Sequence, residues 1–258
     1  RMRTEHQQLT QLQLYRTDEY PCSYLPERLA SSQMVAPIDR INDSNYGQLI
    51  DLGFRRSGLY VYRPQCPNCR ACQSYRIVVN AFAPNRSQRR CWKKWSHLHV
   101  RMVELNFSEE HFALYRRYIE SRHADGAMAN DTEEQYQQFF LRSAITSFLV
   151  EFRDAHGVLR MVSVIDQTAS GLSAMYTFYD PAPEFAGLGT YGILWQVQIA
   201  RQFGLKFVYL GFWIAGSPKM RYKQQFGPAE ILLNGVWQPF EPSSEKSNPS
   251  SNPPAETN

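Results

Sequence analysis

The order in which helical and strand patterns follow one another in the second half of the chain restricts the fold more than any other sequence feature. Apolar residues at helical spacing are followed there by short apolar runs that end at turn signals. The patterns predict two helices, three strands, a helix and a strand, at 108–123, 132–140, 148–152, 158–166, 172–179, 191–203 and 207–214. The turn Thr-Ala-Ser-Gly between the second and third strands predicts an antiparallel meander.

This order matches the second half of the acetyltransferase-like fold of N-acyl transferases. We therefore predict an α+β protein with an acetyltransferase-like mixed sheet and flanking helices over residues 106–240. A basic lobe that contains all the cysteines is predicted at 1–105. Residues 241–258 have no large apolar side chain after Phe240, so they cannot offset the entropy of ordering, and we expect a disordered tail.

The segment from Glu184 to Gly189 lies where acetyltransferases bind the pyrophosphate of coenzyme A, and it keeps two glycines before a helix. A glutamate stands where the acetyltransferase motif has Arg or Gln, and a carboxylate repels a pyrophosphate. The fold prediction is unaffected, but a coenzyme A-dependent N-acetyltransferase becomes the weaker alternative.

Basic residues gather in the first half of the chain. Between Arg55 and Arg101 there are eleven Arg or Lys and no Asp or Glu, although the whole chain carries a net charge of only +4. A face that neutralises the backbone of a polyanion has this composition. A solvated helix face is the alternative.

Three cysteines form the run Cys66-Pro-Asn-Cys69-Arg-Ala-Cys72, whose two-residue spacers let neighbouring thiolates converge on one metal. Cys22 is our choice for a fourth ligand, and Cys91 is the alternative. Because we expect a cytosolic protein, disulfides are not expected, and the candidates are a tetrahedral zinc ion, an iron–sulfur cluster or free thiols. No histidine lies near the run, so its predicted role is structural rather than catalytic.

No stretch of the sequence approaches the roughly 18 to 20 apolar residues that a membrane span needs. The first ten residues are polar and lack the apolar region of a signal peptide. We therefore expect a cytoplasmic protein with no membrane partner.

Motifs spread over about residues 20 to 230 resemble the bacterial aspartate/glutamate leucyltransferases. In the first half they are Tyr20-Pro-Cys-Ser-Tyr-Leu25, Gly53-Phe-Arg-Arg-Ser-Gly58, Tyr62-Arg-Pro64, the cysteine run and Ser87-Gln-Arg-Arg90. In the second half they are Tyr118, Arg122-His123, Gly126, Met128, Tyr176-Thr-Phe178, Asp180-Pro181, Leu188-Gly-Thr190, Tyr209-Leu-Gly211, Trp213-Ile214, Lys219-Met220, Tyr222-Lys223 and Phe226. Gly187 and Phe212 depart from the pattern, which has Ser and Tyr there.

The resemblance implies transfer of leucine from leucyl-tRNA to proteins that begin with Asp or Glu, which marks them for degradation. Eukaryotic arginyltransferases share much of the pattern, so an arginyl-tRNA–protein transferase is the alternative. A non-enzymatic RNA-binding protein built on a metal knuckle is a third reading, and the long strand-rich second half argues against it.

An aminoacyl ester is already activated, so the enzyme has mainly to hold two substrates together and handle a proton. Asp166, at the end of a predicted strand, is our candidate for proton acceptance or amine placement, and a turn cap is its structural alternative. Tyr176 on the next strand is the candidate that orients the amine or the ester carbonyl, with a plain core aromatic as the alternative.

An acidic acceptor side chain requires a cation. Arg122 and His123, at the end of a predicted helix, are our first candidates, and Lys219, Arg221 and Lys223 are the rivals. An ion pair between Arg122 and Glu120, or a solvated helix end, is the structural alternative for Arg122.

The tRNA acceptor stem is expected on a basic helix within the first half. Its predicted contacts are Arg86, Arg89, Arg90, Lys93 and Lys94. Trp92 and Trp95 lie three residues apart and would share one helix face, where they could stack on an unpaired end, although core packing is the more common fate of such residues.

Overall fold

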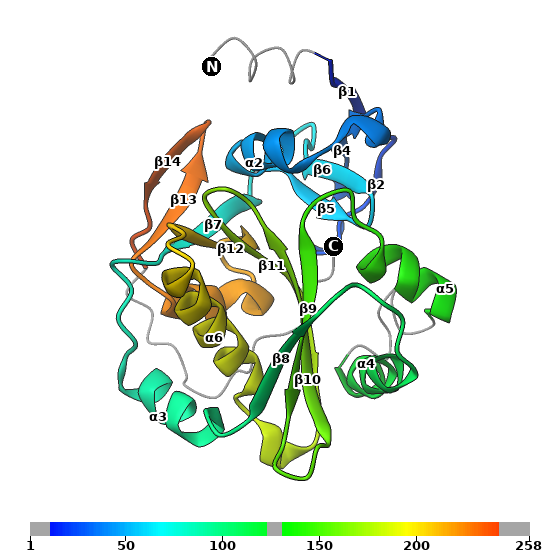
Figure 1. Ribbon diagram of the computed structural model, residues 1–258. Coiled ribbons are helices and arrows are strands. Elements are labelled where there is room, and N and C mark those ends of the chain that lie inside the picture. The colour runs from blue at the N-terminus through cyan, green and yellow to red at the C-terminus, as the bar shows by residue number, and fades with distance from the viewer. Residues whose placement is uncertain (1–10, 123–130, 243–258) are drawn as a thin grey trace.

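The computed structural model describes residues 11–122 and 131–242 and folds them around one large mixed β-sheet (Figure 1). In order across this sheet, its strands are β14 (Val236–Pro239), β13 (Ala229–Leu233), β7 (Gln73–Val78), β12 (Phe207–Trp213), β11 (Gly171–Tyr179), β10 (Leu159–Gln167), β9 (Ser147–Arg153) and β8 (His99–Val103). A smaller sheet consists of β1 (Gln13–Arg16), β4 (Ser32–Ala36), β6 (Tyr60–Pro64) and β5 (Arg55–Ser57), and β2 (Tyr20–Pro21) pairs with β3 (Leu29–Ala30).

Helices cover both faces of the large sheet. The main helical segments are α2 (Asp43–Asp51), α3 (Arg86–Trp95), α4 (Glu109–Arg122), α5 (Glu133–Tyr136), the π-helical turn η2 (Gln137–Leu141), α6 (Leu188–Gln202) and the 3₁₀ segment η4 (Pro218–Gln225). The helix α6 packs on β11 and β12 and is itself contacted by α3, whereas α4 packs on β10 and β11 (Figure 1). Within the described ranges no helix is long and apolar enough to span a membrane.

The predicted succession of elements is confirmed. It is α4, the continuous α5 and η2 segment, the antiparallel strands β9 to β11, then α6 and β12. The mixed α/β class with a large mixed sheet and flanking helices is likewise confirmed.

The predicted boundary at residue 105 does not coincide with a boundary between the sheets. Both β7 and β8 precede this residue, yet β7 lies between β13 and β12 in the large sheet, and β8 forms its edge beside β9. Most of the predicted disordered tail, residues 243–258, lies outside the described residues.

The neighbouring parallel strands β11 and β12 pair over only part of their length. Their partners run from Gly171 opposite Phe207 to Ser173 opposite Tyr209. A register irregularity then interrupts the pairing of β10 with β11 between Val164 and Ile165. Because β11 continues to residue 179 and β12 to residue 213 with no further mutual pairs in the described chain, the two strands separate toward their carboxyl ends.

A buried ion pair attaches the small sheet to the large one. The Arg56 guanidinium in β5 donates from Nε to Oδ2 of Asp166 in β10 at 2.6 Å and from Nη2 to Oδ1 at 2.7 Å. Both side chains are at most 2% exposed, and the Ser147 hydroxyl donates a third hydrogen bond to the same carboxylate, at 2.7 Å. Arg56 also donates to the backbone carbonyls of Gly58 and Arg142, so its charge is well compensated.

The turn after β5 fits tightly against η2. Gly58 has a φ of +58°, and a Cβ at this position would lie 2.3 Å from the carbonyl oxygen of Gln138. Only glycine combines this conformation with this close approach. Gly58, the second glycine of the Gly53–Gly58 motif, is therefore required for the small sheet to pack against η2.

A second contact joins α2 to the large sheet. The Tyr209 hydroxyl donates to Asp51 at the end of α2, and Arg76 donates to the same carboxylate at 3.2 Å. The Arg76 guanidinium lies between two aromatic rings, 3.6 Å from the centroid of Phe207 and 3.9 Å from that of Trp237. This stacking ties β14 to β7 and β12.

We expect Arg56→Leu to lower the free energy of unfolding by about 3–5 kcal/mol, because it leaves the buried Asp166 carboxylate without its cation. Urea denaturation monitored by circular dichroism measures the loss. The control is Glu120→Ala, which removes only an exposed pair with Arg116 one helical turn away and costs about 0.5 kcal/mol or less. Equal effects of the two substitutions would contradict the assigned role of the ion pair.

Candidate functional site

Beyond Ser173 and Tyr209 the parallel strands β11 and β12 no longer pair, and open α/β sheets bind ligands beyond the carboxyl ends of their parallel strands. The helix α6, which connects the two strands, begins at this point with Gly187 as its N-cap. Gly187 has a φ of +93°, a backbone conformation that favours glycine. The candidate site is therefore the region around the N-terminus of α6 and the ends of β11 and β12.

A buried donor lies beside this helix start. Trp95 in α3 is 6% exposed, and its indole Nε1 has no hydrogen-bond partner among the described residues. A Cβ built at Gly187 would lie 3.6 Å from this nitrogen and 3.7 Å from the Cys91 sulfur. The Cys91 thiol donates to the Gly187 carbonyl at 3.2 Å. An indole N–H and the first backbone N–H groups of α6 thus lie close together, an arrangement suited to an anion.

The structure places Asp166 and Tyr176 on the same face of the sheet. Tyr176 lies opposite Val164, and Asp166 is two residues further along β10, where side chains return to the same face. Asp166 is 0% exposed, and its oxygens accept hydrogen bonds from Arg56 and Ser147. Asp166 is therefore a buried hydrogen-bond acceptor for Arg56 and Ser147 and not a turn cap.

Tyr176 lies in an aromatic cluster between the sheet and the helices on one side. Its ring centroid is 4.9 Å from that of Phe140 and 6.2 Å from that of Phe139, both in η2. It also contacts Tyr115 of α4 at 6.4 Å, and it is 2% exposed. The structure thus shows the core packing that was the alternative for Tyr176, and its predicted catalytic role stays a prediction.

Arg122, at the end of α4, lies against the end of β11. Its guanidinium carbon is 4.8 Å from the ring centroid of Tyr179 and 5.3 Å from that of Tyr118. Burial raises the pKa of Tyr179 to about 12, while the charge of Arg122 and its hydrogen bond oppose the rise. Glu120 pairs with Arg116 at 3.7 Å. His123, the predicted companion of Arg122, lies outside the described residues.

The three rival cations all come from η4, which follows β12. Lys219 and Arg221 are exposed, whereas Lys223 is 0% exposed. The Lys223 ammonium donates to the carbonyl of Phe212 near the end of β12, at 2.7 Å. Lys219 and Arg221 are therefore open to a substrate, and Lys223 is committed to contacts within the fold.

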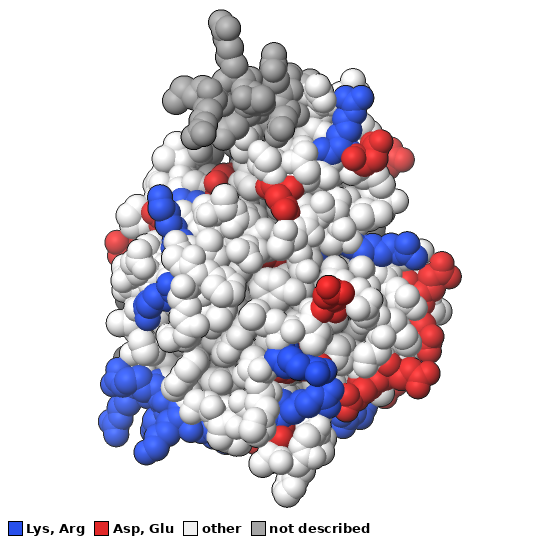
Figure 2. Space-filling view, viewed as in Figure 1, with Lys and Arg blue, Asp and Glu red and all other residues white. Residues whose placement is uncertain are grey.

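The predicted RNA-binding residues lie together on the exposed side of α3, and all five are exposed: Arg86, Arg89, Arg90, Lys93 and Lys94. Figure 2 shows this group of basic side chains at the lower left, with no acidic side chain among them on the face displayed. The Lys94 ammonium lies 3.5 Å from the carbonyl oxygen of Glu184, in the segment that leads to α6. The basic face and the candidate site are thus adjacent.

The two tryptophans of α3 pack inward. Trp92 lies 5.2 Å from Tyr191 and Trp95 lies 6.0 Å from Phe185, measured between ring centroids. Trp95 is buried, but Trp92 is only half-buried and lines a cavity.

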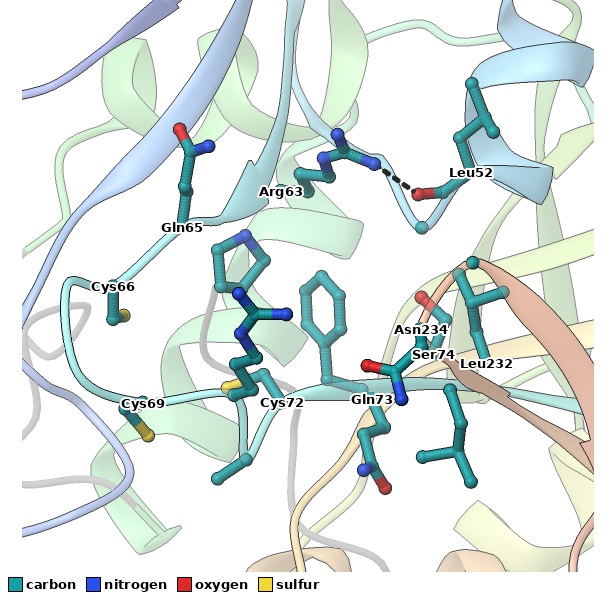
Figure 3. A pocket seen from close by; sticks show the side chains of 17 residues that line it. Leu52, Arg63, Gln65, Cys66, Cys69, Cys72, Gln73, Ser74, Leu232 and Asn234 are labelled. Carbon is teal, nitrogen blue, oxygen red and sulfur yellow. Dashed lines mark hydrogen bonds between the residues drawn. The ribbon is translucent and has the colours of Figure 1, made fainter.

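The cysteine run surrounds one end of a cavity of about 450 Å³ (Figure 3). Burial raises the pKa of the Cys72 thiol to about 12, the nearby Cys22, Cys66 and Cys69 raise it further, and Lys223 opposes the rise. The four predicted ligands are therefore neighbours. Their donor set suits zinc or an iron–sulfur cluster, but in the described chain no group of three or more Cys, His, Asp or Glu side chains already converges on a metal position.

Sequence reasoning missed the structural role of Arg55 and Arg56, which it included only in the basic segment and in the Gly53–Gly58 motif. Both are at most 3% exposed, and Arg55 donates to the carbonyl of Ala174 in β11 at 3.2 Å.

Two family descriptions match most of the chain. Residues 20–90 match "Arginine-tRNA-protein transferase, N terminus", and residues 110–233 match "Arginine-tRNA-protein transferase, C terminus". The "Aspartate/glutamate leucyltransferase" of Thiobacillus denitrificans is 52% identical over 89% of this chain and 95% of that protein. The protein of the same name from Chromobacterium violaceum is 48% identical over 90% of this chain and 95% of that protein.

Among solved structures, the chain resembles "The structure of L-PGS from Bacillus licheniformis" with a TM-score of 0.43 and 13% identity, over 57% of this chain and 48% of that chain. This similarity is too low to support an argument about fold or function. The two family matches and the close relatives together establish that the chain belongs to the arginine-tRNA-protein transferase family.

Proposed function

We propose that the protein transfers leucine from leucyl-tRNA to the N-terminal Asp or Glu of acceptor proteins and so marks them for degradation. The observation that carries this proposal is the 52% identity to an aspartate/glutamate leucyltransferase over 95% of that relative. The reaction needs a site for an RNA end, a site for a peptide N-terminus and a junction between them. The exposed basic helix, the cations near the strand ends and the opening between β11 and β12 supply these three parts.

The large sheet fits an acetyltransferase-like architecture. Its meander is followed by a helix and a parallel strand, and the two parallel strands separate beyond Ser173 and Tyr209. Separated strands leave backbone N–H and C=O groups available to an extended substrate. This feature supports the acetyltransferase-like class and an acyl-transfer site at the opening.

The donor RNA would lie along α3. Five exposed cations contact the phosphate backbone, and the aminoacylated end passes over the segment at Glu184 to the start of α6. There the indole Nε1 of Trp95, which is buried and has no hydrogen-bond partner within the described residues, lies beside the start of α6, where the last phosphate would bind. The exposed Glu184 side chain disfavours a free pyrophosphate, which weighs against coenzyme A as the donor.

The acceptor would bind near the carboxyl ends of the two separated strands. Arg122 lies against Tyr179 at the end of β11, and Lys219 and Arg221 follow the end of β12. An acidic first residue placed between these cations would present its α-amine to the opening. The contribution of His123 stays a prediction from sequence.

Deprotonation of the acceptor demands little of the protein. A free α-amine has a pKa of about 7.7–8.0, so part of it is already neutral near pH 7. Because both oxygens of Asp166 accept hydrogen bonds from Arg56 and Ser147, we favour a structural role for Asp166 over the proton acceptance or amine placement predicted from the sequence. Asp166 would hold the small sheet against β10. Tyr176, on the same face of the large sheet, would orient the amine or the ester carbonyl.

The four neighbouring cysteines Cys22, Cys66, Cys69 and Cys72 would hold a zinc ion or an iron–sulfur cluster. Such a group would join the segment after β2 to the loop between β6 and β7 and so stabilise the cysteine-containing part of the chain. The cytoplasmic location predicted from the sequence accords with thiols of this kind.

Transfer should occur from leucyl-tRNA to peptides that begin with Asp or Glu and not to those that begin with Lys or Ala. The measurement is incorporation of labelled leucine, with arginyl-tRNA and acetyl coenzyme A as parallel donors. Transfer from arginyl-tRNA instead would establish the arginyl alternative. If neither aminoacyl-tRNA supports transfer to an acidic peptide, the proposed function is wrong.

RNA affinity should depend on salt through the cations of α3. We expect Arg86→Gln and Lys93→Gln each to reduce the slope of log affinity against log salt by about one, because each removes one phosphate contact. Fluorescence anisotropy with a labelled tRNA at several salt concentrations measures the slope. Arg28→Gln is the control, since Arg28 is exposed but lies outside α3. Unchanged slopes in both α3 variants would exclude this helix from the RNA contact.

Protein purified without oxygen should contain zinc, or iron with sulfide, in a fixed ratio to the chain. We expect Cys72→Ser to lose the metal and Cys91→Ser to retain it, because Cys91 contacts Gly187 at the start of α6. Elemental analysis of both variants and the parent provides the measurement. A folded parent protein without metal would refute the metal site, and loss of metal from Cys91→Ser would make Cys91 a ligand.

A further inference from the structure

A second cavity lies between α3 and α6, away from the cysteine run. It encloses about 430 Å³, a volume within the usual range of small-molecule sites. Phe82 and Trp92 contribute aromatic surface, Arg89 and Arg201 contribute positive charge, and Gln198 lies at an exposed position of its lining. The residues that line it include no Asp or Glu.

The two arginines of this cavity are held in place by backbone carbonyls. Arg89 donates from Nη1 to the Pro84 carbonyl at 2.8 Å. Arg201 donates from Nη2 to the carbonyls of Val79 and Phe82 at 2.8 and 3.0 Å. Each guanidinium has further N–H donors, so both charges are fixed in position and still available to a ligand.

We propose that this groove binds an unpaired nucleotide of the donor RNA, a few positions before its aminoacylated 3′ end. Fixed cations suit the phosphate, and aromatic surface suits the base, because every base has a face that stacks without regard to sequence. The inference rests on the proposed function, since it names the part of the tRNA that binds next to α3.

The position of the groove along α6 agrees with this assignment. The acceptor stem would contact the exposed cations of α3, and Arg89 is both one of those cations and part of the lining. Gln198 lies ten residues after Leu188, which places the groove about 15 Å along α6 from the site proposed for the 3′ end. The tRNA 3′ end is single-stranded, and a short stretch of it spans this distance.

The charge of the lining favours RNA over a protein segment as the occupant. An apolar peptide would gain nothing from two fixed guanidinium groups, and it would have to desolvate both. Arg89 belongs both to the lining and to the basic face of α3, where a phosphate backbone is already expected. A protein segment therefore remains only as an outcome of the test.

The test compares the binding of two uncharged RNA hairpins that carry the same acceptor stem, one blunt and one with four unpaired 3′ nucleotides. Gln198→Trp fills the groove, and Gln198→Glu adds a negative charge within it. The matched controls are Gln202→Trp and Gln202→Glu, because Gln202 is exposed on the same helix and does not line the groove. The two Glu variants have equal net charge, so long-range electrostatics cancel between them.

The parent protein should bind the tailed hairpin at least about tenfold more tightly than the blunt one. Both Gln198 variants should lose this preference, and both Gln202 variants should keep it. One abasic position in the tail should reduce the parent's preference in the same way, since it removes the base but keeps the phosphate.

Each contrary result has a defined meaning. Equal binding of the two hairpins by the parent, or an unchanged preference in the Gln198 variants, overturns the groove assignment and leaves the proposed function standing. A Gln198 effect on the KM for acceptor protein, with RNA preference intact, assigns the groove to a protein segment and also overturns the inference. Failure to bind either hairpin counts against the proposed function itself.

Discussion

The buried pair of Arg56 and Asp166 is the contact on which the relative placement of the two sheets depends. A carboxylate and a guanidinium removed from water are stable only when each is fully hydrogen-bonded, and here the ring of donors and acceptors comes from β5, β9, β10 and the end of η2. Any shift of the small sheet would leave a charge unpaired. The pair therefore favours this one placement of the small sheet.

The same arrangement supports the part of β11 where its pairing with β12 ends. Arg55, next to Arg56, donates to the Ala174 carbonyl, one residue beyond the last pair between β11 and β12. The carbonyl is thus satisfied at the point where the ladder ends, and the strands can separate without a buried orphan group there. Strands that stop pairing within a sheet would otherwise leave such groups unsatisfied, and Arg55 of the small sheet satisfies this one.

Local patterns predicted the elements of the second half correctly because periodicity and turn residues report on neighbouring positions. The helix α4, the meander β9 to β11 and the buried helix α6 all followed from such patterns. The sheet membership of β7 and β8 could not be predicted this way, because it depends on partners distant in sequence. The burial of Arg56 was equally hidden, since nothing near it in the sequence identifies Asp166 as its partner.

The candidate site was only partly predictable for the same reason. Surface placement of the α3 cations follows from local composition, and the structure shows all five exposed. Lys219 and Lys223 are identical side chains four residues apart, yet Lys219 is exposed and Lys223 is fully buried. The winding of η4 directs Lys223 to the Phe212 carbonyl, and the sequence alone does not reveal this. The roles of Asp166 and Tyr176 depend on what packs around them, and no sequence pattern records that.

The position of β7 between β12 and β13 has a consequence for how the chain acquires its structure during synthesis. The strand leaves the ribosome early, but both neighbours follow more than about a hundred residues later. Until then its two edges have no partners, and pairing between distant strands is slow and exposes edges to aggregation. The region matched by the first family description thus contains a strand whose partners both lie in the second region, and we expect the first region to need the second, or a chaperone, to stay soluble during synthesis.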